Sequence, residues 1–193
     1  MISPTQKTTE IFRFGLIADP QYADEDDAYN FDGSHKRYYR ATLSSVEQAV
    51  STWNSENVPF VMQLGDIIDG KCQNNNNSQK ALETVLEKFK QLKCGLNNVY
   101  HALGNHELYN FSRSELSQWF GQPEFYYEFS PVPGFRFIVL NSYEKSVIWK
   151  NEPQITEDCY DFLSKHNPNP IRSGILLFFF VFVFNPKLNI VLR

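Results

Sequence analysis

The chain has 193 residues, of which 42% are hydrophobic and 16% aromatic, and this suits one folded domain with a substantial core. The formal net charge is -4 and no basic run is longer than Lys36-Arg37, so we expect no nucleic-acid partner. Three cysteines without close spacing, and an amino terminus without an apolar leader, predict a cytoplasmic chain that does not enter a membrane.

The first half of the chain predicts alternating strands and helices. Apolar residues 11–18 form a first strand, and after an acidic loop Ser34 is expected to cap a helix whose apolar face repeats every three or four residues. Residues 58–64 are expected to form a second strand, Ser78 to cap a second helix, and residues 98–103 to form a third strand. This order is typical of a parallel sheet with right-handed crossovers.

The second half is expected to begin with a short helix and a hairpin. Ser112 and Glu115 have the spacing of a capping box at a helix start. Two aromatic segments, residues 125–129 and 135–140, are separated by Pro-Val-Pro-Gly and predict neighbouring strands. Residues 155–165 have a weaker helical pattern.

The end of the chain has a different character. Residues 175–184 are an unbroken apolar run, which as a helix reaches only about 15 Å of a membrane core of about 30 Å. Its aromatic and β-branched residues are compatible with a buried strand. We therefore divide the chain into residues 1–172, the N-terminal part of an α/β domain, and an atypical apolar tail, residues 173–193.

A polar cluster follows each of the three strands expected in the parallel sheet. Because the carboxyl ends of parallel strands meet at the ligand-binding edge of a sheet, we expect these clusters to converge. The clusters are Asp19-Pro20-Gln21, Gly65-Asp66-Ile67-Ile68-Asp69 and Gly104-Asn105-His106-Glu107.

These residue types point to metal-assisted hydrolysis of a phosphate ester. Carboxylate and amide oxygens suit hard divalent ions, and Asp66 on the central strand is placed to bridge two of them. Two ions about 3.5 to 4 Å apart can bind a phosphate and activate a water. His106 is a candidate proton carrier. Singly, Asp19 and Asp66 are common turn residues, and only the three clusters together favour a site. The other histidines, His35, His101 and His166, are expected to be structural.

The three clusters resemble the first three motifs of the calcineurin-like metallophosphoesterases. Asp-Pro-Gln in place of Asp-x-His, with residues 32–40 and 104–113, resembles the manganese-dependent diphosphatases of ADP-ribose and CDP-alcohols within that family, over residues 12–162. The resemblance implies an α/β fold, the α/β/β/α sandwich, here incomplete at its C-terminal side. It also implies hydrolysis of a small nucleoside diphosphate derivative to a nucleoside monophosphate by a monomeric enzyme with two Mn²⁺ ions.

The resemblance also implies a role for each residue. Asp19, Gln21 and Asp66 would hold one metal ion, and Asp66 and Asn105 would reach the second. His106 would stabilise or protonate the leaving group, and Asp69 would orient a neighbour. An amide at position 21 hardens the site and favours Mn²⁺ over Zn²⁺.

The family completes its site with three later histidines, two of them in a Gly-His-x-His motif. Here only His166 follows His106, and no such motif is present. We therefore expect an incomplete Mn²⁺ site and reduced activity. Two alternatives remain open: an inactive truncated form that binds metal or nucleotide weakly, and a metallophosphodiesterase of another ester.

Overall fold

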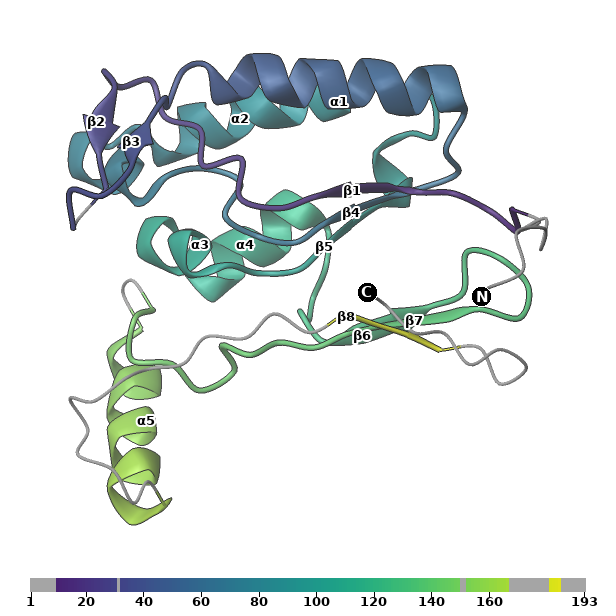
Figure 1. Ribbon diagram of the computed structural model, residues 1–193. Helices are drawn as coiled ribbons and strands as arrows, with labels where there is room; N and C mark the ends of the chain where they lie inside the picture. The colour runs from purple at the N-terminus through teal and green to yellow at the C-terminus, as the bar shows by residue number, and fades with distance from the viewer. Residues whose placement is uncertain (1–9, 31, 150–151, 167–180, 185–193) are drawn as a thin grey trace, which may run out of the picture.

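The computed structural model describes residues 10–30, 32–149, 152–166 and 181–184. A parallel sheet lies at its centre in the order β1-β4-β5, as the sequence predicts. Its strands are Gly15–Ile17 (β1), Val61–Gln63 (β4) and Val99–His101 (β5). In Figure 1 the helices α1 and α2 lie along one side of this sheet, and a second sheet lies on the other side.

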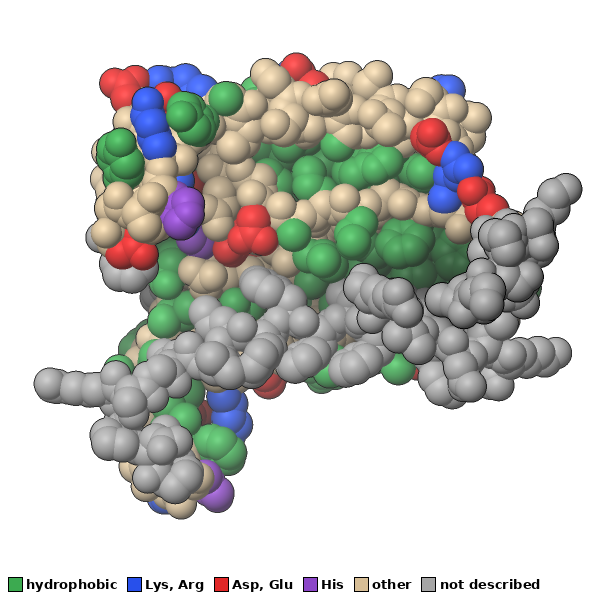
Figure 2. All heavy atoms as spheres, viewed as in Figure 1, with side chains coloured by type: hydrophobic (Ala, Val, Ile, Leu, Met, Phe, Trp, Pro, Cys, Tyr) green, Lys and Arg blue, Asp and Glu red, His purple; other side chains and the backbone are tan. Residues whose placement is uncertain are grey.

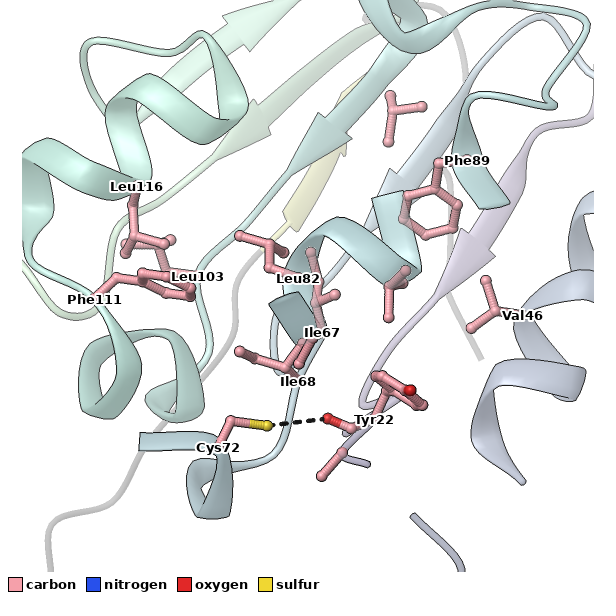
Figure 3. Close-up of a cluster of buried hydrophobic side chains, with 14 of the residues drawn as sticks. Tyr22, Val46, Ile67, Ile68, Cys72, Leu82, Phe89, Leu103, Phe111 and Leu116 are labelled. Carbon is pink, nitrogen blue, oxygen red and sulfur yellow. Dashed lines mark hydrogen bonds between the residues drawn. The ribbon is translucent and has the colours of Figure 1, made fainter. Parts of the chain in front are cut away.

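The helical side of the parallel sheet holds the larger hydrophobic core. α1 (Thr42–Glu56) and α2 (Ser78–Phe89) turn apolar side chains toward the strands. Figure 3 shows part of this cluster, in which Val46, Leu82 and Phe89 come from the two helices and Ile67 and Ile68 from the loop after β4. The apolar periodicity of both helices is therefore confirmed.

The expected helix start at Ser34 is wrong. Residues on either side of it form a small antiparallel hairpin of β2 (Ala28–Tyr29) and β3 (Lys36–Arg37). The Ser34 N–H donates to Asp32 Oδ1 at 2.9 Å, so the serine belongs to an Asx turn. Such local turns compete with helix capping for the same residue types, and α1 begins only at Thr42.

Short helices lie next to the second and third parallel strands. η1 (Gly70–Asn75) comes after β4, and η2 (Leu96–Asn98) precedes β5. α3 (Asn105–Asn110), which the sequence did not predict, and α4 (Arg113–Phe120) come after β5. The capping box of Ser112 and Glu115 at the start of α4 is confirmed.

The expected cap at Ser78 is wrong by one residue. Asn77 occupies the N-cap position of α2, without a hydrogen bond from its side chain to the helix. The Ser78 hydroxyl instead donates to Asn110 Oδ1 at 2.7 Å, where both side chains are buried. The serine therefore ties α2 to α3.

The second sheet is antiparallel, in the order β6-β7-β8. β6 (Tyr127–Phe129) and β7 (Arg136–Val139) confirm the predicted hairpin. β8 (Val181–Phe184) comes from the apolar tail and pairs with β7, and the rest of residues 173–193 lies outside the described residues. α5 (Pro153–His166) lies at one end of this sheet (Figure 1).

A layer rich in aromatic rings joins the two sheets, and we call it the inter-sheet layer. Its buried residues are Phe60, Met62, Ala102, Phe135, Phe137 and Val139. The Phe137 ring centroid lies 5.2 Å from that of Phe60 and 5.1 Å from that of Phe129. Figure 2 shows hydrophobic side chains reaching the surface between the helical layer and the sheets. In the described part of the chain, no helix has the length and apolar character needed to cross a membrane.

Candidate metal centre

The predicted clusters after β1 and β4 are bonded to each other through their backbones. The Asp19 N–H donates to the Gly65 carbonyl at 3.2 Å, and the Gln21 N–H donates to the Asp66 carbonyl at 2.9 Å. Tyr22 continues the pattern by donating its N–H to the Ile67 carbonyl at 3.1 Å. Parallel pairing therefore extends beyond the sheet and brings Asp19 and Asp66 together.

The two carboxylates converge on one atom. Gln21 Nε2 lies 3.2 Å from Asp19 Oδ1 and 3.3 Å from Asp66 Oδ2. Asn105 and His106, from the third cluster, line the same cavity of about 750 Å³. Sequence reasoning therefore located the three clusters correctly at one edge of the sheet.

The backbone of the centre takes up a conformation that side chains usually avoid. Asp19, Gln21 and Asp66 have positive φ angles of 53°, 47° and 54°. This left-handed region costs a non-glycine residue of order 1 kcal/mol or more, and such residues are concentrated at functional sites. The surrounding hydrogen bonds must therefore hold all three residues in place.

The loops after β4 and β5 approach so closely that two positions have no room for a side chain. A Cβ atom added to Gly104 would lie 2.0 Å from Asp66 Oδ1. Gly65 has a φ of 93°, and a Cβ atom there would lie 2.3 Å from the Gly104 nitrogen. Glycine is therefore required at both positions for Asp66 to reach the first turn of α3.

Asp66 is buried, with an exposed fraction of 4%. Its Oδ1 accepts a hydrogen bond from the His106 backbone N–H at 2.8 Å. Burial raises the pKa of the Asp66 carboxyl well above its usual value, and the nearby Asp19 charge raises it further against that hydrogen bond. A cation between the two carboxylates would relieve this repulsion.

The His106 ring has a defined tautomer. The Gly70 N–H donates to His106 Nδ1 at 2.6 Å, so the neutral ring carries its proton on Nε2. Burial lowers the pKa of His106, although Asp69 Oδ2, 3.6 Å from Nδ1, acts in the opposite direction. His106 is therefore a neutral side chain that can donate a hydrogen bond from Nε2.

Comparison with known proteins agrees with this geometry. A family model described as calcineurin-like phosphoesterase matches residues 12–187. The chain belongs to the calcineurin-like phosphoesterase family. The match continues past residue 172, and the proposed division of the chain at that point stays a prediction.

Several relatives of this calcineurin-like phosphoesterase share one name. The human and mouse proteins named manganese-dependent ADP-ribose/CDP-alcohol diphosphatase are 41% and 42% identical to it, over 86% of this chain and 54% of theirs. A crystal structure of a dimetal phosphatase from Danio rerio superposes with a TM-score of 0.72 at 40% identity, over 82% of this chain and 53% of that one. The chain thus spans about half the length of the relatives it matches.

Asp69 is placed to orient its neighbours in this calcineurin-like phosphoesterase. The residue is buried, with an exposed fraction of 4%. Oδ1 accepts from the Lys71 N–H at 2.9 Å, and Oδ2 accepts from Arg37 Nη1 at 3.0 Å. Arg37 Nη1 also donates to Gln21 Oε1. Arg37 therefore joins the hairpin β2-β3 to the centre, a link for which the sequence offered only its place in residues 32–40.

Glu107 is the second residue whose role the sequence did not reveal. It is 2% exposed, and Oε2 accepts the N–H groups of Asp66 and Gly104 at 2.8 and 2.7 Å. Oε1 accepts the Ile67 N–H at 2.7 Å. One buried carboxylate thus holds the loops after β4 and β5 together. The only sequence signal was its position directly after His106.

The donor set suits a hard divalent ion with water completing the coordination. Asp19 and Asp66 offer carboxylates, and Gln21 and Asn105 offer amides. No group of three or more His, Cys, Asp or Glu side chains forms a metal site in the part of the chain described above. Gln21 now directs Nε2 at the carboxylates and Oε1 at Arg37, so ligation by Gln21 requires its amide to turn over.

Proposed function

We propose that this chain hydrolyses the pyrophosphate bond of nucleoside diphosphate derivatives such as ADP-ribose and CDP-alcohols with the help of Mn²⁺. The products would be a nucleoside monophosphate and a phosphorylated partner. The convergence of Asp19 and Asp66 on one atom carries the proposal, because it provides the carboxylate pair that a bridged metal site needs. The names of the relatives support manganese and this substrate class.

The proposed roles follow the donor positions. Asp19, Asp66 and, after its amide turns over, Gln21 would hold one Mn²⁺ ion, and Asp66 and Asn105 would reach the second. When bound, such ions attract a phosphate group and lower the pKa of a water molecule. Asp69 would keep Arg37 in position through Oδ2. Through Oδ1 it would hold the backbone at Lys71, next to Gly70, whose N–H donates to His106 Nδ1.

His106 would stabilise the leaving phosphate rather than protonate it. Its Nδ1 accepts a hydrogen bond, so the proton on Nε2 is the single ring proton. Giving that proton away would produce an unstable imidazolate, whereas donating a hydrogen bond from Nε2 stabilises negative charge on the leaving oxygen. Our proposal therefore selects hydrogen bonding from the two roles of His106 that the sequence left open.

A second candidate function is weak binding of metal or nucleotide without turnover. The donor set favours it, because the described residues of the cavity supply two carboxylates and two amides as ligands but no imidazole, since His106 is assigned to the leaving group. Each protein ligand that water replaces weakens the hold on the metal. Hydrolysis of another phosphodiester remains the third candidate. The cytoplasmic location, the monomeric state and the lack of nucleic-acid binding stay predictions.

The test is a substrate panel with the purified chain. We expect Mn²⁺-dependent release of AMP from ADP-ribose and of CMP from CDP-choline, and loss of both in Asp66→Asn. The matched control Asp158→Asn, at an exposed position of α5, should behave as wild type. Calorimetric binding of Mn²⁺ without product would favour the second candidate. Faster cleavage of bis(p-nitrophenyl) phosphate than of either diphosphate would favour the third.

A further inference from the structure

Two basic side chains line the same cavity as the proposed metal ligands. Arg37 and Lys71 both contribute to its wall, beside Asp19, Asp66 and Asp69. The proposed substrates carry two phosphate groups, and bound ions at Asp19 and Asp66 would neutralise mainly the one that is attacked. The second phosphate therefore needs a different positive partner.

Arg37 is anchored in a way that leaves part of its guanidinium available. Its Nη1 donates to Asp69 Oδ2 at 3.0 Å and to Gln21 Oε1. Within the described residues, Nε and Nη2 of Arg37 make no hydrogen bond, and 35% of the side chain is exposed. An arginine fixed by one nitrogen and open at the others has the fork geometry that binds phosphate oxygens.

Lys71 is held over an aromatic ring. Its Nζ lies 4.6 Å from the centroid of the Tyr39 ring, and Tyr39 is buried with an exposed fraction of 3%. The Lys71 backbone N–H donates to Asp69 Oδ1, so both ends of the residue are restrained. A lysine held in this way loses little further freedom when it binds an anion.

Arg37 and Lys71 share one anchor. Asp69 accepts from Arg37 through Oδ2 and from the Lys71 backbone through Oδ1, so the two residues flank the same carboxylate. The neighbouring Lys36 provides a contrast. Its Nζ lies 5.0 Å from the ring of the exposed Tyr38, and Lys36 does not line the cavity. Successive residues of β3 thus place one cation in the cavity and one outside it.

We propose that Arg37 and Lys71 form a subsite for the second phosphate group of a diphosphate substrate. The substrate class rests on the proposed function. Three carboxylates, those of Asp19, Asp66 and Asp69, outnumber the two cations in the cavity wall, so the bare cavity repels anions. Binding of a diphosphate should therefore be strong only together with Mn²⁺, and it should exceed binding of a monophosphate.

The first test compares two nucleotides that differ by one phosphate group. α,β-Methylene-ADP and AMP are titrated calorimetrically into the whole chain with and without Mn²⁺. We expect wild type to prefer α,β-methylene-ADP in the presence of Mn²⁺. Arg37→Gln and Lys71→Gln should each weaken binding of this ligand about tenfold and binding of AMP about twofold or less. The matched control Lys36→Gln should leave both affinities unchanged.

Because Arg37 also contacts Gln21, the Mn²⁺ affinity of each variant is measured separately by electron paramagnetic resonance. Lys71→Gln should keep the wild-type Mn²⁺ affinity, and this variant therefore decides the result if Arg37→Gln weakens metal binding. The proposal is overturned if wild type has no preference for the diphosphate ligand. It is also overturned if Lys71→Gln weakens both nucleotides equally.

Steady-state kinetics separates this subsite from the proposed function. Lys71→Gln should raise KM for ADP-ribose about tenfold with little change in kcat, and leave hydrolysis of bis(p-nitrophenyl) phosphate, which has one phosphate, unchanged. A chain that prefers α,β-methylene-ADP but hydrolyses nothing would refute the proposed function and keep the subsite. A chain that hydrolyses ADP-ribose equally well with and without Lys71 would refute the subsite and keep the function.

Discussion

The strand-end centre and the inter-sheet layer are built in opposite ways from the same three parallel strands. At the centre, buried polar groups meet: Glu107 accepts three backbone N–H groups, and Asp66 accepts one. In the inter-sheet layer, rings such as those of Phe60 and Phe137 pack face to edge, with an angle of 82° between their planes.

The difference concerns what each region tolerates. An apolar layer loses stability roughly in proportion to the volume removed from it, and its neighbours can relax. The hydrogen-bond geometry around a buried carboxylate is disturbed when one partner changes, because donors are then left without acceptors. We therefore expect substitutions in the inter-sheet layer to affect unfolding and those in the centre to affect metal binding. Four substitutions test this contrast.

The largest loss of stability is expected from Phe137→Ala. The ring is fully buried and contacts Phe14, Phe60 and Phe129, so its removal should lower the free energy of unfolding by about 3 to 5 kcal/mol. Urea denaturation measures the change, and Tyr126→Ala, at a residue 52% exposed, is the control. Unchanged Mn²⁺ affinity in the folded protein would sharpen the contrast; a large loss of affinity would contradict it.

Glu107→Gln should reduce stability less than Phe137→Ala does, but it should lower the Mn²⁺ affinity of the centre more. The amide nitrogen would face backbone N–H groups that now donate to a carboxylate, at a cost of about 2 to 3 kcal/mol. Mn²⁺ affinity should fall because the Asp66 backbone loses its acceptor. Both quantities are measured by denaturation and calorimetry, with the exposed Glu83→Gln as control. Wild-type Mn²⁺ affinity in Glu107→Gln would show that the loops after β4 and β5 keep their arrangement without the Glu107 carboxylate.

His101 lies at the end of β5, and its burial should make the stability of the protein depend on pH. Burial lowers the pKa of His101 to about 3, from 6.5 for an exposed histidine. The unfolded chain therefore takes up a proton below pH 6.5 that the folded chain refuses, so stability is full above pH 6.5 and falls toward pH 3. The fall is about 1.4 kcal/mol per pH unit.

The variant His101→Gln isolates this contribution, because glutamine does not titrate and can still reach Gln63, which lies 3.3 Å from His101 Nδ1. Subtracting its stability curve from that of wild type removes the opposite contribution of Asp66 and Glu107, whose raised pKa values reduce stability as pH rises. A flat difference between pH 6.5 and 5 would mean that His101 is protonated in the folded chain.

The smallest effect is expected at a helix end that belongs to neither region. Ser112→Ala removes the side-chain acceptor of the α4 capping box and should cost about 1 kcal/mol. Mn²⁺ affinity should not change. Thermal denaturation measures the loss, and Gln118→Ala, at an exposed position of the same helix, is the control. An effect on metal binding would mean that α4 is coupled to the centre.

Much of the fold could be predicted because its signals are local. The apolar runs before Asp19, Asp66 and Asn105 indicated strands, and the alternation with helices indicated parallel pairing. The hairpin around Ser34 could not be predicted, because its strands have two residues each and depend on a turn that resembles a helix cap.

The candidate site was predicted as a set of chemical groups but not as a network. Convergence of Asp19 and Asp66 followed from topology. Arg37 and Glu107 could not be assigned, since single basic and acidic residues are ordinary in any sequence. Their roles depend on contacts across 32 and 41 residues, which only the folded chain brings together.

The left-handed backbone at Asp19, Gln21 and Asp66 sets thermal stability against metal binding. Glycine adopts such angles without the steric strain that a Cβ atom causes. Asp19→Gly, at the exposed position of the three, should make the protein harder to melt and poorer at holding Mn²⁺. The chain thus has a proposed metal ligand at a position where glycine would give higher thermal stability.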